Sequence, residues 1–227
     1  MKTRKDIFLH SMYLIGLRKT IPAGVVNSVQ IIENHEPLVD IKQDSRFFFG
    51  GKLIDAPKIF LRNNVYKKLL YAIDKLPQNH HFKIYSAFRS VEEQKYLWDR
   101  EYARNKQENP SMSEDQLIKL TKSFCADPRN GFGGHQTGGA VDISLCDKNG
   151  IDYDMGTKYS QKNDYTYTKA KGISPESMKN RKILLNALTS VGLVNYPGEW
   201  WHFCYGDKMW AAYKGLAICS YGAINEK

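Results

Sequence analysis

Apolar residues recur at helical spacing in several stretches of the chain. Positions 65–76 place apolar side chains on one face and lysines away from it, which predicts a helix that packs on a core. Ser90 and Ser174 are typical N-caps, Pro175 suits a first helical position, and Gly192 suits the end of a helix. The helices expected on this basis cover 65–76, 91–106, 113–124 and 174–191.

Other stretches have the alternation or the β-branched residues of strands. Expected strands cover 25–32, 82–85, 140–145 and 200–204. The segment 33–49 predicts a loop with short extended pieces. Residues 147–172 are polar and lack periodicity, which predicts a long loop, and long ordered loops in compact domains are often functional.

Length and composition indicate one ordinary globular domain. The chain has 227 residues, of which 42% are hydrophobic and 25% charged, and a single core commonly extends to about 250 residues. We expect a main domain over 25–227, preceded by an N-terminal extension over 1–24.

The chain is basic, with a formal net charge of +9, but the charges are scattered. The densest runs are 1–5 and 179–182, and neither is interleaved with aromatic residues as in a platform for single-stranded nucleic acid. We therefore expect a solvated basic face and no nucleic-acid partner. A polyanionic partner of the cell envelope stays open.

The N-terminal segment resembles a poor signal peptide, with lysines before an apolar stretch over 7–17. Asp6, His10 and the following Arg18 and Lys19 argue against export, and an apolar run of about 11 residues is too short to span a bilayer. We expect a cytoplasmic protein without stable membrane insertion, or a periplasmic one if the segment acts as a signal. The four widely spaced cysteines are expected to be reduced and mostly buried.

One glycine-rich stretch, 131–144, carries His135 and Asp142, seven positions apart. A simple strand does not bring these two side chains together, whereas a turn built on the flanking glycines can fold His135 back beside Asp142. The alternative is a glycine-rich hairpin with a surface histidine. Spacing alone leaves both interpretations open.

A second segment, Glu199-Trp200-Trp201-His202, strengthens the first. Alone, Glu199 could be a cap and His202 a core histidine. Together, the two segments supply two imidazoles and two carboxylates, which is the inventory of a catalytic zinc site with three ligands, one base and an open position for water. The other histidines lack such companions and are expected in the core or at the surface; they are His10, His35, His80 and His81.

The pattern His135-x-x-Gly138-x-Ala140-x-Asp142, followed by Glu199-x-Trp201-His202, resembles the paired signature of the zinc D-Ala-D-Ala metallopeptidases of the VanX and VanY type. The resemblance covers about residues 25–205. It implies an α+β single domain with a central, mainly antiparallel sheet flanked by helices, a fold shared with the Hedgehog signalling domain.

The resemblance also implies roles for individual residues. His135, Asp142 and His202 would bind Zn²⁺, and Glu199 would be the general base. Arg89, expected at a strand-to-helix junction, would stabilise the developing oxyanion; without the resemblance it reads as a surface or ion-paired arginine. The implied partner is a small D-amino-acid peptide, and the implied setting is the bacterial cell wall.

The motifs do not all resemble the same branch of the family. Asp154-Met155-Gly156-Thr157 and the double tryptophan resemble the D-Ala-D-Ala dipeptidases, whereas Phe88-Arg89-Ser90 with Gln94, and His135-Gln136-Thr137-Gly138, resemble the D,D-carboxypeptidases. Gly133 and the 86–90 segment depart from the usual dipeptidase pattern. We expect a D-Ala-D-Ala dipeptidase, with a carboxypeptidase of peptidoglycan stem peptides as the alternative and a zinc-bearing non-catalytic binding module as a third possibility.

Overall fold

The computed structural model describes residues 3–130, 133–161 and 163–224. Its centre is a five-stranded sheet in which β3 pairs with β5 in parallel and every other pair is antiparallel. In sheet order the strands are β3 (Phe47–Phe49), β5 (His81–Ser86), β6 (Ala140–Cys146), β8 (His202–Cys204) and β7 (Val194–Asn195). The expected α+β fold with a mainly antiparallel sheet is confirmed.

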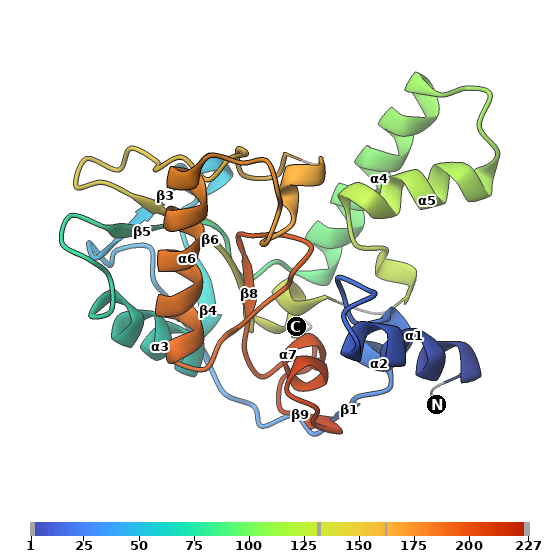
Figure 1. The fold of residues 1–227 in the computed structure, drawn as a ribbon, viewed down its shortest axis with the longest axis horizontal. Helices are drawn as coiled ribbons and strands as arrows, with labels where there is room; N and C mark the ends of the chain where they lie inside the picture. The colour runs from blue at the N-terminus through green and yellow to red at the C-terminus, as the bar shows by residue number, and fades with distance from the viewer. Residues whose placement is uncertain (1–2, 131–132, 162, 225–227) are drawn as a thin grey trace.

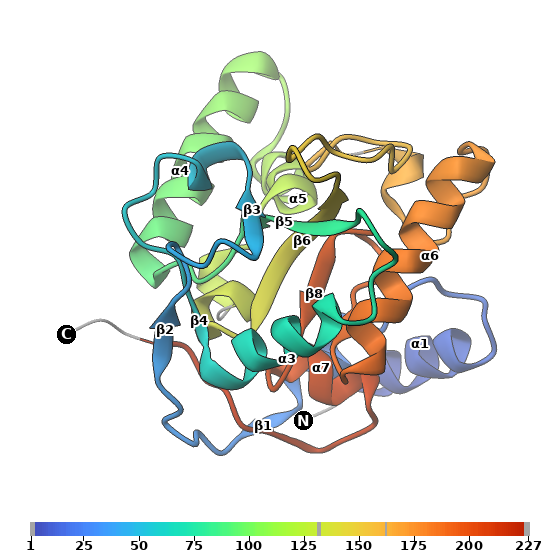
Figure 2. The same ribbon diagram turned by 90° about the vertical axis from the view of Figure 1, so that its left-hand side faces the viewer.

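Two helices, α3 (Asn63–Ile73) and α6 (Pro175–Ser190), cover one face of this sheet (Figure 2). Strand β6 sends Val141, Ile143 and Leu145 into the core that these helices share. Side chains alternate between the faces of a strand, so Asp142 and Ser144 belong to the opposite face. The helix-covered face of β6 therefore contributes to the hydrophobic core, and the opposite face carries its polar side chains.

Helices α4 (Val91–Glu108) and α5 (Glu114–Phe124) form a pair that projects from the rest of the molecule (Figure 1). Ser90 and Ser113 cap them, each as part of a capping box, as the sequence predicts. Asn105 Nδ2 donates to Thr121 Oγ1 at 3.1 Å between the two helices, and both side chains are buried. The start of α4 fixes the chain directly after Arg89.

The N-terminal region differs from the prediction. The expected strand over 25–32 is wrong: α2 (Ala23–Asn27) comes first, and β1 (Gln30–Ile31) is a two-residue strand parallel to β9 (Ile218–Cys219). Val25 and Val29, four positions apart, are buried with Ala211 and Ala212 of α7 (Lys208–Tyr213). Packing against α7, of Val25 in α2 and of Val29 just after it, therefore overrides the β propensity of the valines. Helix α1 (Arg4–Leu14) precedes this region, and the division at residue 24 stays a prediction.

The remaining elements are short. Strands β2 (Leu38–Asp40) and β4 (Phe60–Arg62) form an antiparallel pair. Single 3₁₀ turns lie at η1 (Gly51–Leu53), η2 (Pro128–Asn130), η3 (Gly134–Thr137) and η4 (Asp164–Thr166). The described residues of the segment 147–172, which are 147–161 and 163–172, form a loop, as expected, apart from η4 and an isolated bridge from Asp152 to Cys146. Cys125, Cys146, Cys204 and Cys219 are free, and all but Cys125 are buried.

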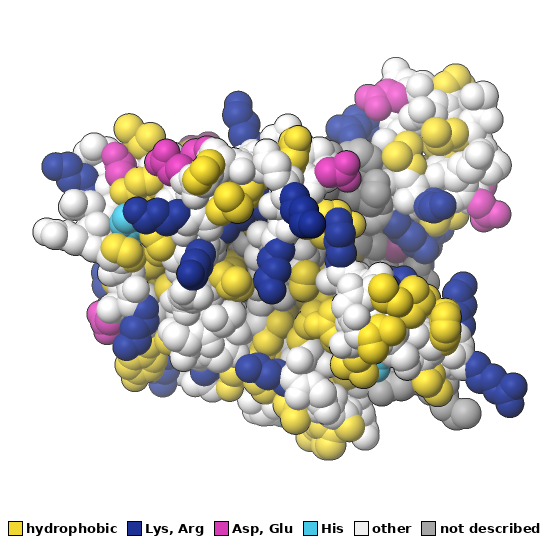
Figure 3. Space-filling model, in the orientation of Figure 1, with side chains coloured by type: hydrophobic (Ala, Val, Ile, Leu, Met, Phe, Trp, Pro, Cys, Tyr) yellow, Lys and Arg dark blue, Asp and Glu magenta, His cyan; other side chains and the backbone are white. Residues whose placement is uncertain are grey.

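Lysines and arginines are spread over the face of the molecule drawn in Figure 3, in keeping with their scatter in the sequence. Arg181 is an exception to the expected solvated face of 179–182. It is only 4% exposed, and its guanidinium donates to the carbonyl oxygens of Met155, Tyr167 and Tyr165, each at 2.7 Å. Burial lowers the pKa of Arg181 to about 10, and its charge is compensated by carbonyl dipoles. Within the described residues, no helix has both the length and the apolar character to cross a membrane.

The turn between η3 and β6 depends on two glycines. Gly138 has φ +69°, a conformation that favours glycine. Gly139 lies so close to β8 that a Cβ there would be 2.6 Å from the Tyr205 carbonyl oxygen, and the Gly139 carbonyl accepts a hydrogen bond from Tyr205 N at 2.9 Å. Side chains larger than hydrogen at 139 would force the two backbones apart.

We therefore expect Gly139→Ala to destabilise the protein by about 1–3 kcal/mol, the usual cost of overpacking. The matched control is Gly133→Ala in the same stretch, where φ is −90° and the nearest atom to an added Cβ is Gln136 Oε1 at 3.3 Å. Urea denaturation of the metal-free proteins measures both changes, and the control is expected within about 0.5 kcal/mol of wild type. If both variants lost the same free energy of unfolding, the close approach of residue 139 to Tyr205 would not be what makes glycine necessary there.

Candidate metal centre

Two of the three proposed ligands lie side by side on adjacent strands of the sheet. In the antiparallel pair of β6 and β8, Asp142 lies directly opposite His202. Phe203 and Val141 point into the core, so their neighbours Asp142 and His202 share the opposite face. Side chains at paired positions of adjacent strands are close enough for direct contact, and Asp142 Oδ1 lies 2.9 Å from His202 Nδ1.

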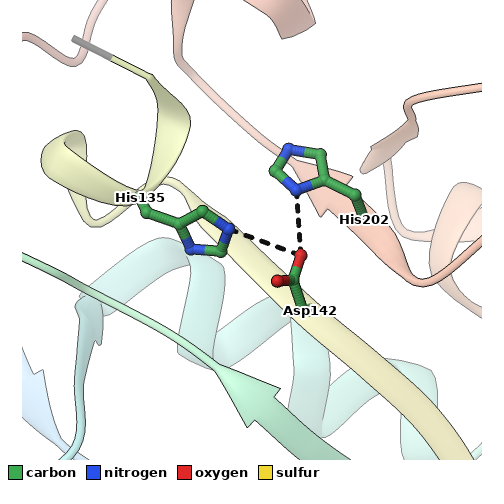
Figure 4. Close-up of side chains that lie close together, drawn as sticks. All are labelled: His135, Asp142 and His202. Atoms are coloured by element: carbon green, nitrogen blue, oxygen red, sulfur yellow. Dashed lines mark hydrogen bonds and ion pairs between the residues drawn. The ribbon is translucent and has the colours of Figure 1, made fainter. Parts of the chain in front are cut away.

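The third proposed ligand, His135, comes from η3 and folds back over β6 (Figure 4). Its Nδ1 donates a hydrogen bond to the carbonyl oxygen of Ala87 at 2.8 Å, which turns Nε2 toward the site. His135 Nε2 lies 3.3 Å from Asp142 Oδ1. A carbonyl in the segment after β5 therefore orients one imidazole toward the other two side chains.

These three side chains have the geometry and chemistry of metal ligands. The candidate ligand atoms of His135, Asp142 and His202 all lie within 4.8 Å of one another. Tetrahedral ligands about 2.1 Å from a zinc ion are about 3.4 Å apart, so the observed spacing fits such an ion. The side chains are 12%, 8% and 9% exposed, respectively. Two imidazoles and a carboxylate, shielded from bulk water, form the donor set of a catalytic zinc site.

The electrostatics keep the carboxylate charged. Burial alone would raise the pKa of Asp142, but the charges and hydrogen bonds of His135 and His202 outweigh it and hold that pKa well below its usual range. Burial likewise opposes the charge of His202, whose pKa is nevertheless raised, chiefly by the hydrogen bond and charge of Asp142. An anionic ligand is therefore ready in the folded chain.

Glu199 and Arg89, the proposed base and oxyanion donor, both lie next to this cluster. Glu199 is in the turn before β8, where its carbonyl accepts from His202 N at 3.2 Å, and its charge acts on His202 and Tyr159. Arg89 donates its backbone N–H to the His135 carbonyl at 3.2 Å, and its charge also acts on Tyr159. The structure thus brings all five predicted site residues into one region.

Two buried glutamines connect Arg89 to the turn of His135. Arg89 donates to Gln94 Oε1 at 2.9 Å, and Gln136 Nε2 donates to the same oxygen at 3.1 Å. Arg89 also donates to Ser86 Oγ at 3.3 Å. The guanidinium is therefore held by the neutral side-chain oxygens of Gln94 and Ser86.

Two functional neighbours were not found from the sequence. Tyr159 Oη donates to Asp142 Oδ2 at 3.1 Å, and Arg62 Nε donates to the Thr137 carbonyl at 2.8 Å, which holds the turn of His135. Burial first, and the charge of Asp142 second, raise the pKa of Tyr159, so the phenol stays protonated. The sequence indicated only that the long aperiodic loop containing Tyr159 could be functional. It did not indicate which residue of the loop would contact the site.

The remaining histidines lie elsewhere, as expected. His80 stacks on Tyr153, His81 meets the edge of Phe48, and His10 stacks on Tyr13. His35 is exposed, with φ 55°. Among the residues that the structure describes, His135, Asp142 and His202 form the one cluster suited to a metal ion.

A mainly antiparallel sheet that presents two imidazoles, a carboxylate and a nearby glutamate defines a candidate metal-dependent hydrolase. Comparison with known proteins agrees with this class. The profile of peptidase family M15, described as D-Ala-D-Ala dipeptidase, matches residues 48–216. The chain belongs to this family.

Curated relatives include D-alanyl-D-alanine dipeptidases from Synechocystis sp., 35% identical over 92 residues, and from Escherichia coli, 32% identical over 69 residues. The matches cover 34% and 30% of this chain, and 36% of each relative, so the chain spans little more than a third of the relatives it matches.

Similar solved structures include the LdcB LD-carboxypeptidase, with a TM-score of 0.49 and 20% identity over 86% of this chain and 85% of that one. Another is the D,D-dipeptidase VanXYg in complex with a D-Ala-D-Ala phosphinate analogue, with a TM-score of 0.42 and 20% identity over 84% of this chain and 68% of that one.

Removing one candidate ligand tests the centre directly. We expect His202→Ala to weaken zinc binding by more than about 100-fold, because loss of a ligand costs more than loss of a supporting contact. Isothermal titration or competition with a chromogenic chelator measures the affinity. The control, His35→Asn, removes an exposed imidazole and keeps a residue that tolerates positive φ, so its affinity is expected to equal that of wild type. Equal weakening in both variants would place the metal elsewhere.

Proposed function

We propose that this protein is a zinc-dependent D-alanyl-D-alanine dipeptidase. The observation that carries the proposal is the convergence of His135, Asp142 and His202 beside Glu199, in a member of the D-Ala-D-Ala dipeptidase family. The names of the curated relatives support the substrate. The donor set supports zinc over the oxygen-seeking cations Mg²⁺ and Ca²⁺, which imidazole suits poorly.

Bound zinc supplies Lewis acidity, which lowers the pKa of a water molecule to about 7 and polarises the peptide carbonyl. Glu199 then accepts the proton of the attacking water and delivers it to the departing amine. The backbone around Glu199 is fixed: its N–H donates to the Tyr196 carbonyl at 3.0 Å, and Asn195 Nδ2 donates to its carbonyl at 3.1 Å. The backbone from which the carboxylate of the base extends is therefore held in place through both its N–H and its carbonyl group.

Arg89 stabilises the carbonyl oxygen on which negative charge develops. Its guanidinium is anchored by the neutral oxygens of Gln94 and Ser86, which leave its positive charge available to an oxyanion. Its Nε is buried and has no hydrogen-bond partner among the described residues. Such an unsatisfied donor is rare in a folded protein, and small movements on substrate binding give it a use.

The dipeptidase assignment is supported by the surroundings of the predicted dipeptidase-like residues. Met155, Gly156 and Thr157 line a cavity of about 570 Å³ together with Tyr159 and Trp200. Trp200 Nε1 donates to Thr157 Oγ1 at 2.8 Å, so the two dipeptidase-like segments are joined in space. Tyr159 also contacts Asp142, which links this wall to the candidate metal centre.

The second candidate is a D,D-carboxypeptidase that acts on peptidoglycan stem peptides. The specific observation in its favour is the contact of Gln94 with both Arg89 and Gln136, because these are the residues that resemble the carboxypeptidases. A non-catalytic zinc-binding module is a third candidate, and the presence of both Glu199 and Arg89 at the cluster argues against it.

A cytoplasmic setting belongs to the same proposal. Thr3 is the N-cap of α1, and the Asp6 carboxylate accepts a hydrogen bond from the Thr3 backbone N–H, which places a negative charge in a segment that is positively charged in an export signal. Fractionation of the native host, with detection of the protein in the periplasmic fraction, would overturn this part alone.

A substrate panel separates the first two candidates. Zinc-loaded protein is expected to hydrolyse free D-Ala-D-Ala, to lose activity on treatment with a chelator, and to regain it when zinc is restored. Release of D-alanine is the readout. Cleavage confined to N-blocked or longer stem peptides would establish the carboxypeptidase, and cleavage of neither would leave the binding module.

Glu199→Gln tests catalysis apart from binding. We expect kcat to fall about 100- to 10,000-fold with zinc affinity unchanged, because the amide cannot accept the proton. The control is Glu176→Gln, at an exposed position in the first turn of α6, which is expected to retain wild-type kcat. A Glu199→Gln variant as active as wild type would exclude the glutamate as general base.

A further inference from the structure

The two oxygens of Asp142 have different partners. Oδ1 faces the imidazoles, 3.3 Å from His135 Nε2 and 2.9 Å from His202 Nδ1. Oδ2 instead accepts the hydrogen bond from Tyr159 Oη at 3.1 Å. The carboxylate therefore presents one oxygen to the candidate metal centre and the other to a phenol.

This division matters because a carboxylate can bind a metal through one oxygen or through both. If Oδ2 also reached the metal, it would compete for the position that water and substrate need. A donor on Oδ2 opposes rotation of the carboxylate, since rotation would break a hydrogen bond to a charged group in a buried site. The Asp142 side chain is only 8% exposed, so bulk water is a poor substitute for that donor.

The position of Tyr159 is set by packing that involves no metal. Its ring stacks on Tyr85 with centroids 4.6 Å apart and meets the edge of Trp201 at 5.5 Å. The loop that carries Tyr159 is tied to α6 by Arg181, which binds the Met155 carbonyl at 2.7 Å. The phenol is therefore in place before any metal binds.

We propose that Tyr159 is a positioning residue that keeps Asp142 a ligand through Oδ1 alone and thereby preserves the open position of the metal. This inference rests on the proposed zinc centre and adds a residue that the paired sequence signature does not contain. Tyr159 acts through Asp142 and takes no part in proton transfer.

The test is Tyr159→Phe, which removes the hydroxyl and keeps the ring that stacks on Tyr85. The matched control is Tyr85→Phe: Tyr85 Oη donates to Asp152 Oδ2 at 2.6 Å, so this variant also loses one hydroxyl bound to a carboxylate, beside the same ring but away from the metal cluster. Zinc affinity is measured by chelator competition. The visible spectrum of the cobalt-substituted proteins reports the coordination, since added ligands weaken the absorption of a four-coordinate cobalt ion.

We expect Tyr159→Phe to bind zinc about 10- to 100-fold more weakly than wild type and to change the cobalt spectrum. Tyr85→Phe is expected to match wild type in both. Urea unfolding of the metal-free variants checks that the two lose similar stability. An unchanged affinity and spectrum in Tyr159→Phe, or an equal change in Tyr85→Phe, overturns the positioning role while the zinc centre stands. Wild-type protein that binds no zinc overturns the centre itself and this inference with it.

Discussion

The site depends on one cross-strand pair. Asp142 and His202 meet because β6 and β8 are antiparallel in a register that sets these residues opposite each other, with Val141 and Phe203 in the core. A slip of one residue by either strand would turn its polar side chain into the core and its apolar neighbours out, at a large cost in buried surface. Hydrophobic packing on α3 and α6 thus enforces the geometry of the polar face. The same alternation that builds the core also brings together Asp142 and His202, the candidate ligand pair.

Two buried guanidiniums bring the other segments to this pair. Arg62 holds the turn of His135 through the Thr137 carbonyl, and Arg181 holds the loop of Tyr159 through the carbonyls of residues 155, 165 and 167. Each binds irregular backbone whose carbonyl groups lack partners from helix or sheet, and five donors in a planar fork suit that task. A lysine, with one compact charge, would satisfy fewer of these carbonyls. The two arginines are therefore structural supports of a site that they do not enter.

The sequence predicted most of the fold because its helices carry strong caps and clear periodicity, as at Ser90 and Ser174. It also placed His135, Asp142, Glu199 and His202 in one site, because glycines and aromatic residues flank them in a recognisable pattern. Val25 and Val29 were misread, since their β propensity yields to contacts with α7 that are distant in the chain. Arg181 and Tyr159 were missed for a related reason. Their roles arise from tertiary contacts with backbone carbonyls and a single carboxylate oxygen, which leave no periodic trace.

The anchoring of the 147–172 loop has a consequence for metal binding. Arg181 and the contact of Trp200 with Thr157 order this loop through the protein itself, so its conformational entropy is lost when the chain folds and not when an ion arrives. Metal affinity then reflects coordination and ligand deprotonation, with little contribution from chain ordering. The selection among metals falls to the donor atoms and to the ions present in the compartment where the protein works.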